Sequence, residues 1–329
     1  MFPPPRPPTP LTRGVLLPFV LPQAAEEVEV IEGDRRGVQA LGAEEDEARH
    51  IEGLVLRENN EELPVGGRLK AFRDRWTFDP WAYSLVSNGL GWKWRQRPPK
   101  FKPFFQPSTP YLEEYVKDLL HKRVVRYARS VRFQGRLFHV PKKDSDKLRT
   151  ILDLSHLNKF IQCDKFQMLT IAQIRTLLPQ GSYTASIDLS DAYWHIPISR
   201  RFSPYLGFKL GRKAYVFKAV PFGLNIAPRI FTKLSETVVE LLRQKRLPGH
   251  VLIRRLPDMG CIEAGVLSSN PEVIKYLQQL GFQINLKKSR LTPSQEFQQL
   301  DLPWNLKSHK LSLPKDKWKE IARAVRCLR

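Results

Sequence analysis

The stretch SIDLSDAYWHIPI, residues 186–198, constrains the fold of this chain more than any other feature. An apolar strand delivers Asp188 to its end, and Asp191 follows one turn later, before an alanine and Tyr193. A carboxylate at the end of a strand is held rigidly, as a metal ligand must be, and an aromatic ring just beyond it can press against a sugar. An aspartate that caps a helix after a strand would produce the same local pattern. Asp188 by itself therefore leaves both interpretations open.

The charge of the chain is unevenly spread. The formal net charge is +21 over 329 residues, yet residues 26–62 hold thirteen acidic and four basic residues. That tract carries −9, which leaves +30 on the rest of the chain. Neutralisation of phosphates and release of counterions supply most non-specific nucleic-acid affinity, so a body this basic favours a nucleic-acid partner. A charge that serves only solubility is the alternative.

The cysteines and the hydropathy indicate the compartment. The three cysteines, an odd number without close spacing, argue against a disulfide scaffold and against a zinc site; they are Cys163, Cys261 and Cys327. No apolar run reaches the roughly 18 residues that a membrane helix needs, so no membrane association is predicted. Residues 14–25 are apolar but contain two prolines, so secretion is not predicted either. We expect an intracellular protein, cytoplasmic or nuclear.

Two segments precede the motifs. Residues 1–65 begin rich in proline and continue into the acidic tract, which predicts a disordered tail. Residues 66–110 form a lead-in segment in which aromatic and basic residues alternate. Such a segment can stack bases or pack into a core, and both remain open for its four tryptophans, Trp76, Trp81, Trp92 and Trp94.

Helices and strands are mixed without a regular alternation. Apolar spacing predicts a helix over residues 111–122, with Ser108 or Thr109 as its cap, and further helices over residues 169–181 and 230–246. Strands and helices in no βαβ order indicate the α+β class.

Two further motifs flank the aspartate motif. Residues 125–144 predict strands around a Gln-Gly turn, and KKDSDKLRTILDLSHLNK, residues 142–159, places Lys142 and Arg149 on a basic strand pair. Arginine can grip a phosphate with two donors and lysine with a point charge, although a solvated basic face is the usual alternative. PFGLNIAP, residues 221–228, follows, and a turn before a helix would explain it in isolation.

These three motifs, in this order, resemble the reverse transcriptase domain of retroelements, and in particular of DIRS-like, tyrosine-recombinase retrotransposons. The VGGRL…W…DPW lead-in, the YWHIPI extension and the LSLP segment are also shared, so the resemblance spans about residues 66–319. It implies a right-hand polymerase with fingers at 111–182, a palm at 183–304 that carries a finger insertion at about 200–215, and the start of a thumb at 305–329. An RNase H domain and a recombinase, which such elements carry downstream, are not expected within these 329 residues.

The resemblance also implies a metal site. Polymerases of this kind use two Mg²⁺ ions held by carboxylates, one for the primer hydroxyl and one for the triphosphate. Asp188 would be the first metal-binding aspartate, and the carbonyl of Leu189 would complete its shell. Asp191 matches a common acidic position that does not bind metal.

The remaining roles concern the substrates, which would be an RNA or DNA template–primer and deoxynucleoside triphosphates. Tyr193 takes the position of the aromatic residue that discriminates between incoming sugars at their 2′ carbon. Phe222 would contact the nucleotide, and Gly223 lets the backbone approach where any side chain would block it. Residues with triphosphate roles are Lys142 and Arg149, and Lys288 would approach the leaving pyrophosphate. Asp153 and Asn158 are predicted to be structural.

One expected motif is damaged. The family places a Tyr-x-Asp-Asp hairpin where this chain has HVLIRRLPDMGCIEAG, residues 250–265. Alignment puts Leu256 at the tyrosine, Asp258 at the first aspartate and Met259 at the second. Either Asp258 is the second metal ligand of a depleted site, or a slip in the reading frame replaced about residues 251–270. We therefore expect an impaired polymerase, with a non-catalytic, nucleic-acid-binding relic as the alternative.

Overall fold

The structure is a computed structural model that describes residues 63–141, 148–164, 170–178, 180–245, 253–255, 262–264, 271–299, 302–312 and 318. All of them belong to one compact unit, Ala43–Arg329. The predicted disordered tail lies outside the described residues except for its end. There, Val65 is 5% exposed and packs in the main hydrophobic core, so the folded part begins before Gly66.

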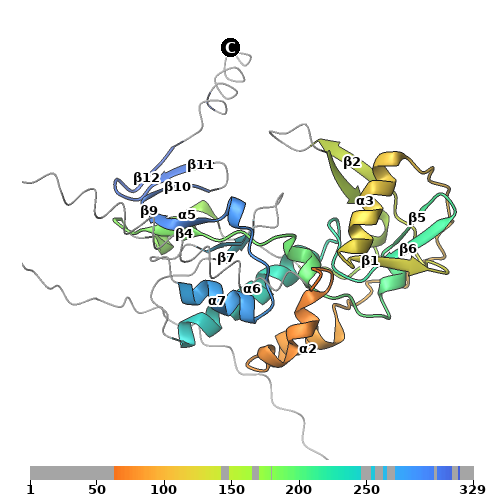
Figure 1. Ribbon diagram of the computed structural model, residues 1–329, viewed down its shortest axis with the longest axis horizontal. Helices are drawn as coiled ribbons and strands as arrows, with labels where there is room; N and C mark the ends of the chain where they lie inside the picture. The colour runs from red at the N-terminus through yellow and green to blue at the C-terminus, as the bar shows by residue number, and fades with distance from the viewer. Residues whose placement is uncertain are drawn as a thin grey trace, which may run out of the picture. The chain divides into compact units, whose positions relative to one another are not determined.

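Helices and antiparallel strands alternate irregularly along the chain (Figure 1). The helices are η1 (Arg68–Trp76), α2 (Pro80–Asn88), α3 (Pro110–His121), α4 (Ser155–Asn158), α5 (Ile171–Leu177), η2 (Ala192–His195), η3 (Ser203–Tyr205), α6 (Ala227–Gln244), α7 (Pro271–Gln279) and η4 (Leu286–Lys288). The strands are β1 (Val125–Ala128), β2 (Leu137–Pro141), β3 (Leu148–Leu152), β4 (Thr184–Ser186), β5 (Gly207–Leu210), β6 (Lys213–Phe217), β7 (Ile253–Arg255), β8 (Ile262–Ala264), β9 (Arg290–Ser294), β10 (Glu296–Gln299), β11 (Leu302–Asn305) and β12 (Lys310–Leu311).

The strands form small sheets rather than one large one. Two sheets have three strands, in the orders β1-β6-β5 and β10-β11-β12, and three pairs stand apart as β2-β3, β4-β9 and β7-β8. Every one of these ladders is antiparallel, which agrees with the predicted α+β class.

All three predicted helices are confirmed at different bounds, and the one predicted over residues 169–181 is α5, Ile171–Leu177. Helix α3 begins at Pro110, and Thr109 caps it by accepting a hydrogen bond from the amide of Leu112 (3.3 Å). Helix α6 begins at Ala227 rather than at residue 230, because Pro228 is tolerated in the first turn, where its missing amide is not needed.

The predicted strand pairing around the Gln-Gly turn is wrong. The two strands exist, but β1 pairs with β6 and β2 pairs with β3. Gln134 donates through Nε2 to the carbonyl of Phe104 (2.6 Å), and the amide of Gly135 donates to the carbonyl of Gly207 (2.8 Å). These contacts to distant segments replace a hairpin turn. Strand β1 thus shares a sheet with β5 and β6, which lie about ninety residues later in the chain.

The tryptophans of the lead-in segment pack into the core. Trp76 is fully buried and donates through its indole nitrogen to the carbonyl of Leu280 (3.0 Å). Trp92 is 9% exposed, and Trp81 and Trp94 are partly buried against the same core. Of the two interpretations left open by the sequence, core packing holds. In the described part of the chain, no helix combines the length and apolarity needed to cross a membrane.

Candidate functional site

The backbone of Asp188 is fixed on both sides. It lies two residues beyond β4, which pairs with β9. Its amide donates to Oγ of Ser289 (2.9 Å), and its carbonyl accepts from the amide of Asn285 (2.8 Å). The residue is only 6% exposed. The carboxylate therefore projects from a backbone that is held in place, which is the geometry predicted for a metal ligand.

The backbone carbonyl of Leu189 points away from the segment that pairs with it. Leu189 bridges to Ile284 in an antiparallel arrangement, and the hydrogen bonds of this bridge are made by the residues that flank it. In such a pair the two central residues turn their own amide and carbonyl groups outward. The Leu189 carbonyl consequently points away from the segment that carries Ile284, as a backbone oxygen ligand beside Asp188 would require.

Asp191 marks a charged corner next to this segment. Its φ of 49° is left-handed, and its carboxylate lies 3.5 Å from the ammonium group of Lys122. Burial raises the pKa of the Asp191 carboxyl, while the positive charges of Lys122 and Lys288 oppose that rise. Lys288, an exposed lysine of η4, directly precedes Ser289, whose Oγ accepts from the amide of Asp188, so this lysine lies near the aspartate motif.

Tyr193 is enclosed by aromatic rings. It is 1% exposed, and its ring packs edge-on against Phe222 (5.2 Å between centroids) and Phe231 (5.6 Å). Phe222 is half-buried and also contacts Trp194. The structure thus brings together two of the predicted nucleotide contacts, Tyr193 and Phe222. Of the two, Phe222 is the more exposed to solvent.

Gly223 lets two distant segments touch. Its φ is +94°, and a Cβ atom built there would lie 2.8 Å from the carbonyl oxygen of Leu152, at the end of β3. Asn158 holds the same loop: its Nδ2 donates to the Gly223 carbonyl (2.8 Å), and its Oδ1 accepts from the amide of Asn225 (3.1 Å). The predicted structural role of Asn158 is confirmed, and the PFG loop is anchored to the base of the basic hairpin.

The basic hairpin itself forms as predicted, but its cations are only partly described. Strands β2 and β3 pair with Val140 opposite Arg149. The backbone of Arg149 lies in β3, and its side chain lies outside the description. Lys142 lies in the connection between the strands, outside the described residues. What the structure establishes is that this hairpin ends beside Gly223.

A second hairpin lies where the damaged motif was aligned. Strands β7 and β8 pair with Arg255 opposite Ile262, β8 contacts β4, and β7 contacts α6. Asp258, the predicted second carboxylate, falls between the two strands and outside the described residues. Pro257 also lies outside the described residues.

One residue of the site was not predicted. His195 is fully buried, its Nε2 accepts from the amide of Gln283 (3.0 Å), and its Nδ1 donates to the carbonyl of Ala192 (3.2 Å). Burial lowers the pKa of His195 to about 3, so the ring is neutral with its proton on Nδ1. His195 thereby ties the aspartate motif to the segment that follows α7. A lone histidine in an apolar stretch gives no sequence signal for such a role.

Comparison with known proteins assigns the family of this region. Residues 140–303 match the family described as reverse transcriptase (RNA-dependent DNA polymerase). The chain carries a reverse transcriptase domain. The match includes Asp188, Leu189, Tyr193, Phe222 and the other site residues named above.

Viral and transposon proteins contain similar sequences. Protein P of duck hepatitis B virus (strain China) is 25% identical over 201 residues, 59% of this chain and 25% of that protein. The Pol polyprotein from transposon 412 of Drosophila melanogaster is 24% identical over 182 residues, 54% of this chain and 14% of that protein. The Pro-Pol polyprotein of simian foamy virus type 1 is 26% identical over 205 residues, 59% and 16% respectively. The chain thus matches at most about a quarter of these relatives.

Solved structures agree on the fold. The foamy viral protease–reverse transcriptase in complex with double-stranded DNA superposes with a TM-score of 0.53 and 23% identity, covering 79% of this chain and 58% of that one. Its dRH form with double-stranded DNA gives a TM-score of 0.54 at 23% identity, covering 79% and 49%. At this identity the likeness concerns the fold.

Proposed function

We propose that this chain is the polymerase part of a DIRS-like retrotransposon, built for DNA synthesis on an RNA or DNA template from deoxynucleoside triphosphates. The observation that carries the proposal is the fixed backbone of Asp188, with the outward-facing carbonyl of Leu189 beside it. The β7-β8 hairpin, which contacts β4, would bring the second carboxylate to the same end of the strand. In this proposal, the sheet of β1, β5 and β6 belongs to the fingers, and β4, β7, β8 and β9 belong to the palm.

The oxygen donors fit divalent magnesium. A carboxylate and a backbone carbonyl are hard ligands of the kind that Mg²⁺ prefers, and they stand next to each other in the chain. Asp188 and Asp258 would hold the metal, with Leu189 as the backbone ligand. When bound, two such ions would activate the primer hydroxyl and neutralise the triphosphate.

The protein residues then position the substrates. Lys142, Arg149 and Lys288 would bind the phosphates, which needs their positive charge rather than any proton transfer. Phe222 and Gly223 would lie under the new base pair, with Tyr193 supporting Phe222 and setting the space available at the 2′ carbon of the sugar. The packing of the Tyr193 ring against Phe222 supports this arrangement.

The natural chain is proposed to be a weak polymerase because its second metal site is depleted. Met259 stands where the family has an aspartate, and a thioether does not replace an anionic oxygen ligand for Mg²⁺. Loss of one carboxylate costs several kcal/mol of transition-state stabilisation, on the order of a thousandfold or more in rate. A frame slip over about residues 251–270 is the proposed origin of the change.

Primer extension on poly-rA/oligo-dT tests the proposal, first with magnesium and then with manganese. The natural chain is compared with a rewritten chain that carries Leu256→Tyr, Pro257→Leu and Met259→Asp. We expect extension from the rewritten chain and at most about a thousandth of it from the natural one. Equal activity in both would show that the natural site is complete, and no activity in either would reject the polymerase assignment.

A non-catalytic nucleic-acid-binding role is the second candidate. The charge of +30 outside the acidic tract favours it, since binding to phosphates needs no second carboxylate. A chain that shifts a labelled template–primer in a gel, while its rewritten form extends nothing, would support this role over the first.

A further inference from the structure

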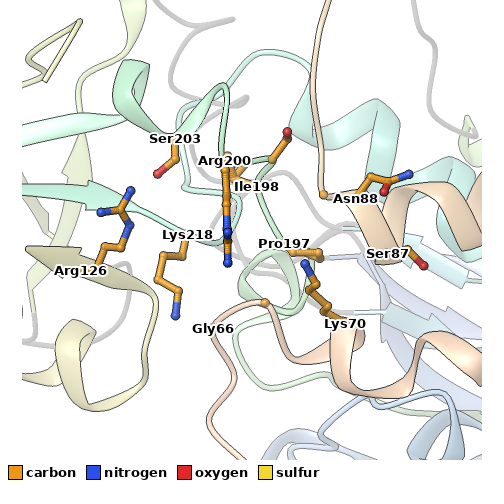
Figure 2. A pocket seen from close by; sticks show the side chains of 13 residues that line it. Gly66, Lys70, Ser87, Asn88, Arg126, Pro197, Ile198, Arg200, Ser203 and Lys218 are labelled. Carbon is orange, nitrogen blue, oxygen red and sulfur yellow. The ribbon is translucent and has the colours of Figure 1, made fainter. Parts of the chain in front are cut away.

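A basic pocket of the described chain is separate from the candidate polymerase site. It has a volume of about 1060 Å³ and lies where η1, the end of α2, β1 and the segment after Pro197 meet (Figure 2). None of the described polymerase-site residues lines it, and neither Asp188 nor Tyr193 does. Its lining includes four cationic side chains, which are Lys70, Arg126, Arg200 and Lys218.

Backbone hydrogen bonds hold the walls of this pocket together. The amide of Leu90 donates to the carbonyl of Pro197 (2.7 Å), and the amide of Ser199 donates back to the carbonyl of Leu90 (3.0 Å). Gly89 makes this approach possible, because its φ is +80° and a Cβ atom there would lie 2.5 Å from the amide nitrogen of Ser199. The NGL turn after α2 is thereby a wall of the pocket, a role that the polymerase site does not explain.

No carboxylate of the described lining offsets the four cations of the pocket. Among the described residues that line it, none is an aspartate or a glutamate. Figure 2 shows Lys70, Arg200 and Lys218 extending into the same space from three separate segments. Burial lowers the pKa of Lys218, and the positive charges of Arg123 and Arg126 add to the effect. An anion in the pocket would relieve this repulsion.

The rest of the lining tells which kind of anion fits. No described lining residue is aromatic, so the pocket offers no ring on which a base could stack. The absence of carboxylates from the described lining leaves no ligand set for a catalytic metal. The pocket has the volume of a cube about 10 Å on a side. A nucleic-acid duplex, whose major groove alone is about 12 Å wide, is too large to enter it. Recognition would rest on backbone phosphates of a single strand, whatever its sequence.

We propose that this pocket binds consecutive phosphates of a single-stranded nucleic acid and holds the strand outside the polymerase cleft. The four cations come from both walls, so they can contact a strand that runs between them. The proposal does not depend on catalysis, since it needs neither Asp258 nor a metal.

Fluorescence anisotropy of a labelled oligo-rA 20-mer, in EDTA and without nucleotides, tests it on the full chain. Arg126→Gln with Lys218→Met removes two pocket charges. The matched control, Arg243→Gln with Lys275→Met, removes the same charge types at exposed positions on α6 and α7. We expect the pocket variant to bind about tenfold more weakly at 100 mM salt, and its log–log salt slope to fall by about 1.4, the value for two contacts on a single strand. The control should change the affinity less than twofold.

Three outcomes would overturn the proposal. One is that the pocket variant and the control lose affinity equally, which would mean that only overall charge matters. Another is that the loss of affinity caused by the pocket variant differs more than tenfold among oligo-dT, oligo-rA and a random RNA. The third is that titration calorimetry finds inorganic triphosphate bound by the natural chain and lost in the pocket variant, while strand binding is unchanged. That last result would identify a site for a free polyphosphate. Because catalysis is not measured, failure here leaves the polymerase assignment intact.

Discussion

At the scale of single residues, Asp188 is the position where structure and chemistry are most closely joined. Its backbone is fixed by Ser289 and Asn285, so a change confined to the carboxylate should leave the fold unaltered. Asp188→Asn in the rewritten chain replaces an anionic metal ligand with a neutral one of the same shape. We expect primer extension to fall by at least about a thousandfold, while binding of template–primer stays within twofold.

The control for this change is Asp74→Asn, on a side chain that is 84% exposed in η1. It should leave extension unchanged. Extension that survives Asp188→Asn would show that the metal ligands lie elsewhere in the chain.

His195 makes the stability of the fold depend on pH. Its ring is neutral and fully buried, with a pKa lowered to about 3, against about 6.5 for histidine in an unfolded chain. Between these values the unfolded chain binds more protons, so the free energy of unfolding decreases as the pH falls below 6.5. This histidine alone should remove about 2 kcal/mol between pH 7 and pH 5.

Urea unfolding at the two pH values measures the effect. His195→Gln should be less stable at pH 7, because it loses the donor–acceptor pair to Ala192 and Gln283, and its pH-dependent loss should be about 2 kcal/mol smaller. His121→Gln, at an exposed position on α3, is the control. If both variants kept the natural pH dependence, the buried ring would not be its source.

At the scale of elements, the contact between the PFG loop and β3 rests on Gly223. A comparison of Gly223 with Gly181 distinguishes the cost of backbone strain from the cost of close approach, because both residues have a positive φ. A Cβ atom at Gly181 would meet nothing within 4 Å, whereas a Cβ atom at Gly223 would lie 2.8 Å from the carbonyl oxygen of Leu152. Gly181→Ala should cost about 1 kcal/mol from strain alone. Gly223→Ala should cost about 1–3 kcal/mol more, and extension by the rewritten chain should fall with it.

Thermal unfolding and primer extension of both variants decide the point. Equal loss of stability in the two would mean that the loop moves aside without cost. Loss of stability without loss of extension would show that the contact with β3 does not position the nucleotide.

Sequence patterns predicted the local elements better than their partners. The cap at Thr109 and the apolar spacing behind it suffice to predict α3, because a helix is specified by neighbouring residues. The pairing of β1 with β6 depends on residues about ninety positions apart, and nothing near Gln134 reveals it. In the site, Asp188 and Gly223 stand out in the sequence through their motifs. His195 does not, since its role exists only once Gln283 lies against it.

At the scale of the whole molecule, the fold brings together motifs that lie far apart in the sequence. The PFG loop meets the end of the basic hairpin at Gly223 and Leu152, and the aspartate motif is joined to the segment around η4 by the hydrogen bonds of Asp188. The lead-in segment closes this arrangement from outside, because Arg68 donates through Nε to the carbonyl of Gly281 (3.0 Å) and Trp76 to that of Leu280. Its glycines and lysine also complete the basic pocket.

The acidic tract should weaken the binding of nucleic acid by the rest of the chain. Residues 26–62 carry −9, so their deletion leaves a chain of +30, whereas deletion of residues 1–25, which hold two arginines and no acidic residue, leaves +19. Opposite charges near a basic surface compete with phosphates and lower the association rate at low salt.

We expect the deletion of residues 26–62 to tighten binding of an oligo-rA 20-mer by about tenfold at 50 mM salt. At 300 mM, where charges are screened over about 6 Å, it should tighten binding by less than threefold. The second deletion should have little effect at either salt concentration. If both deletions tightened binding equally, removal of the tail itself, and not of its charge, would be responsible.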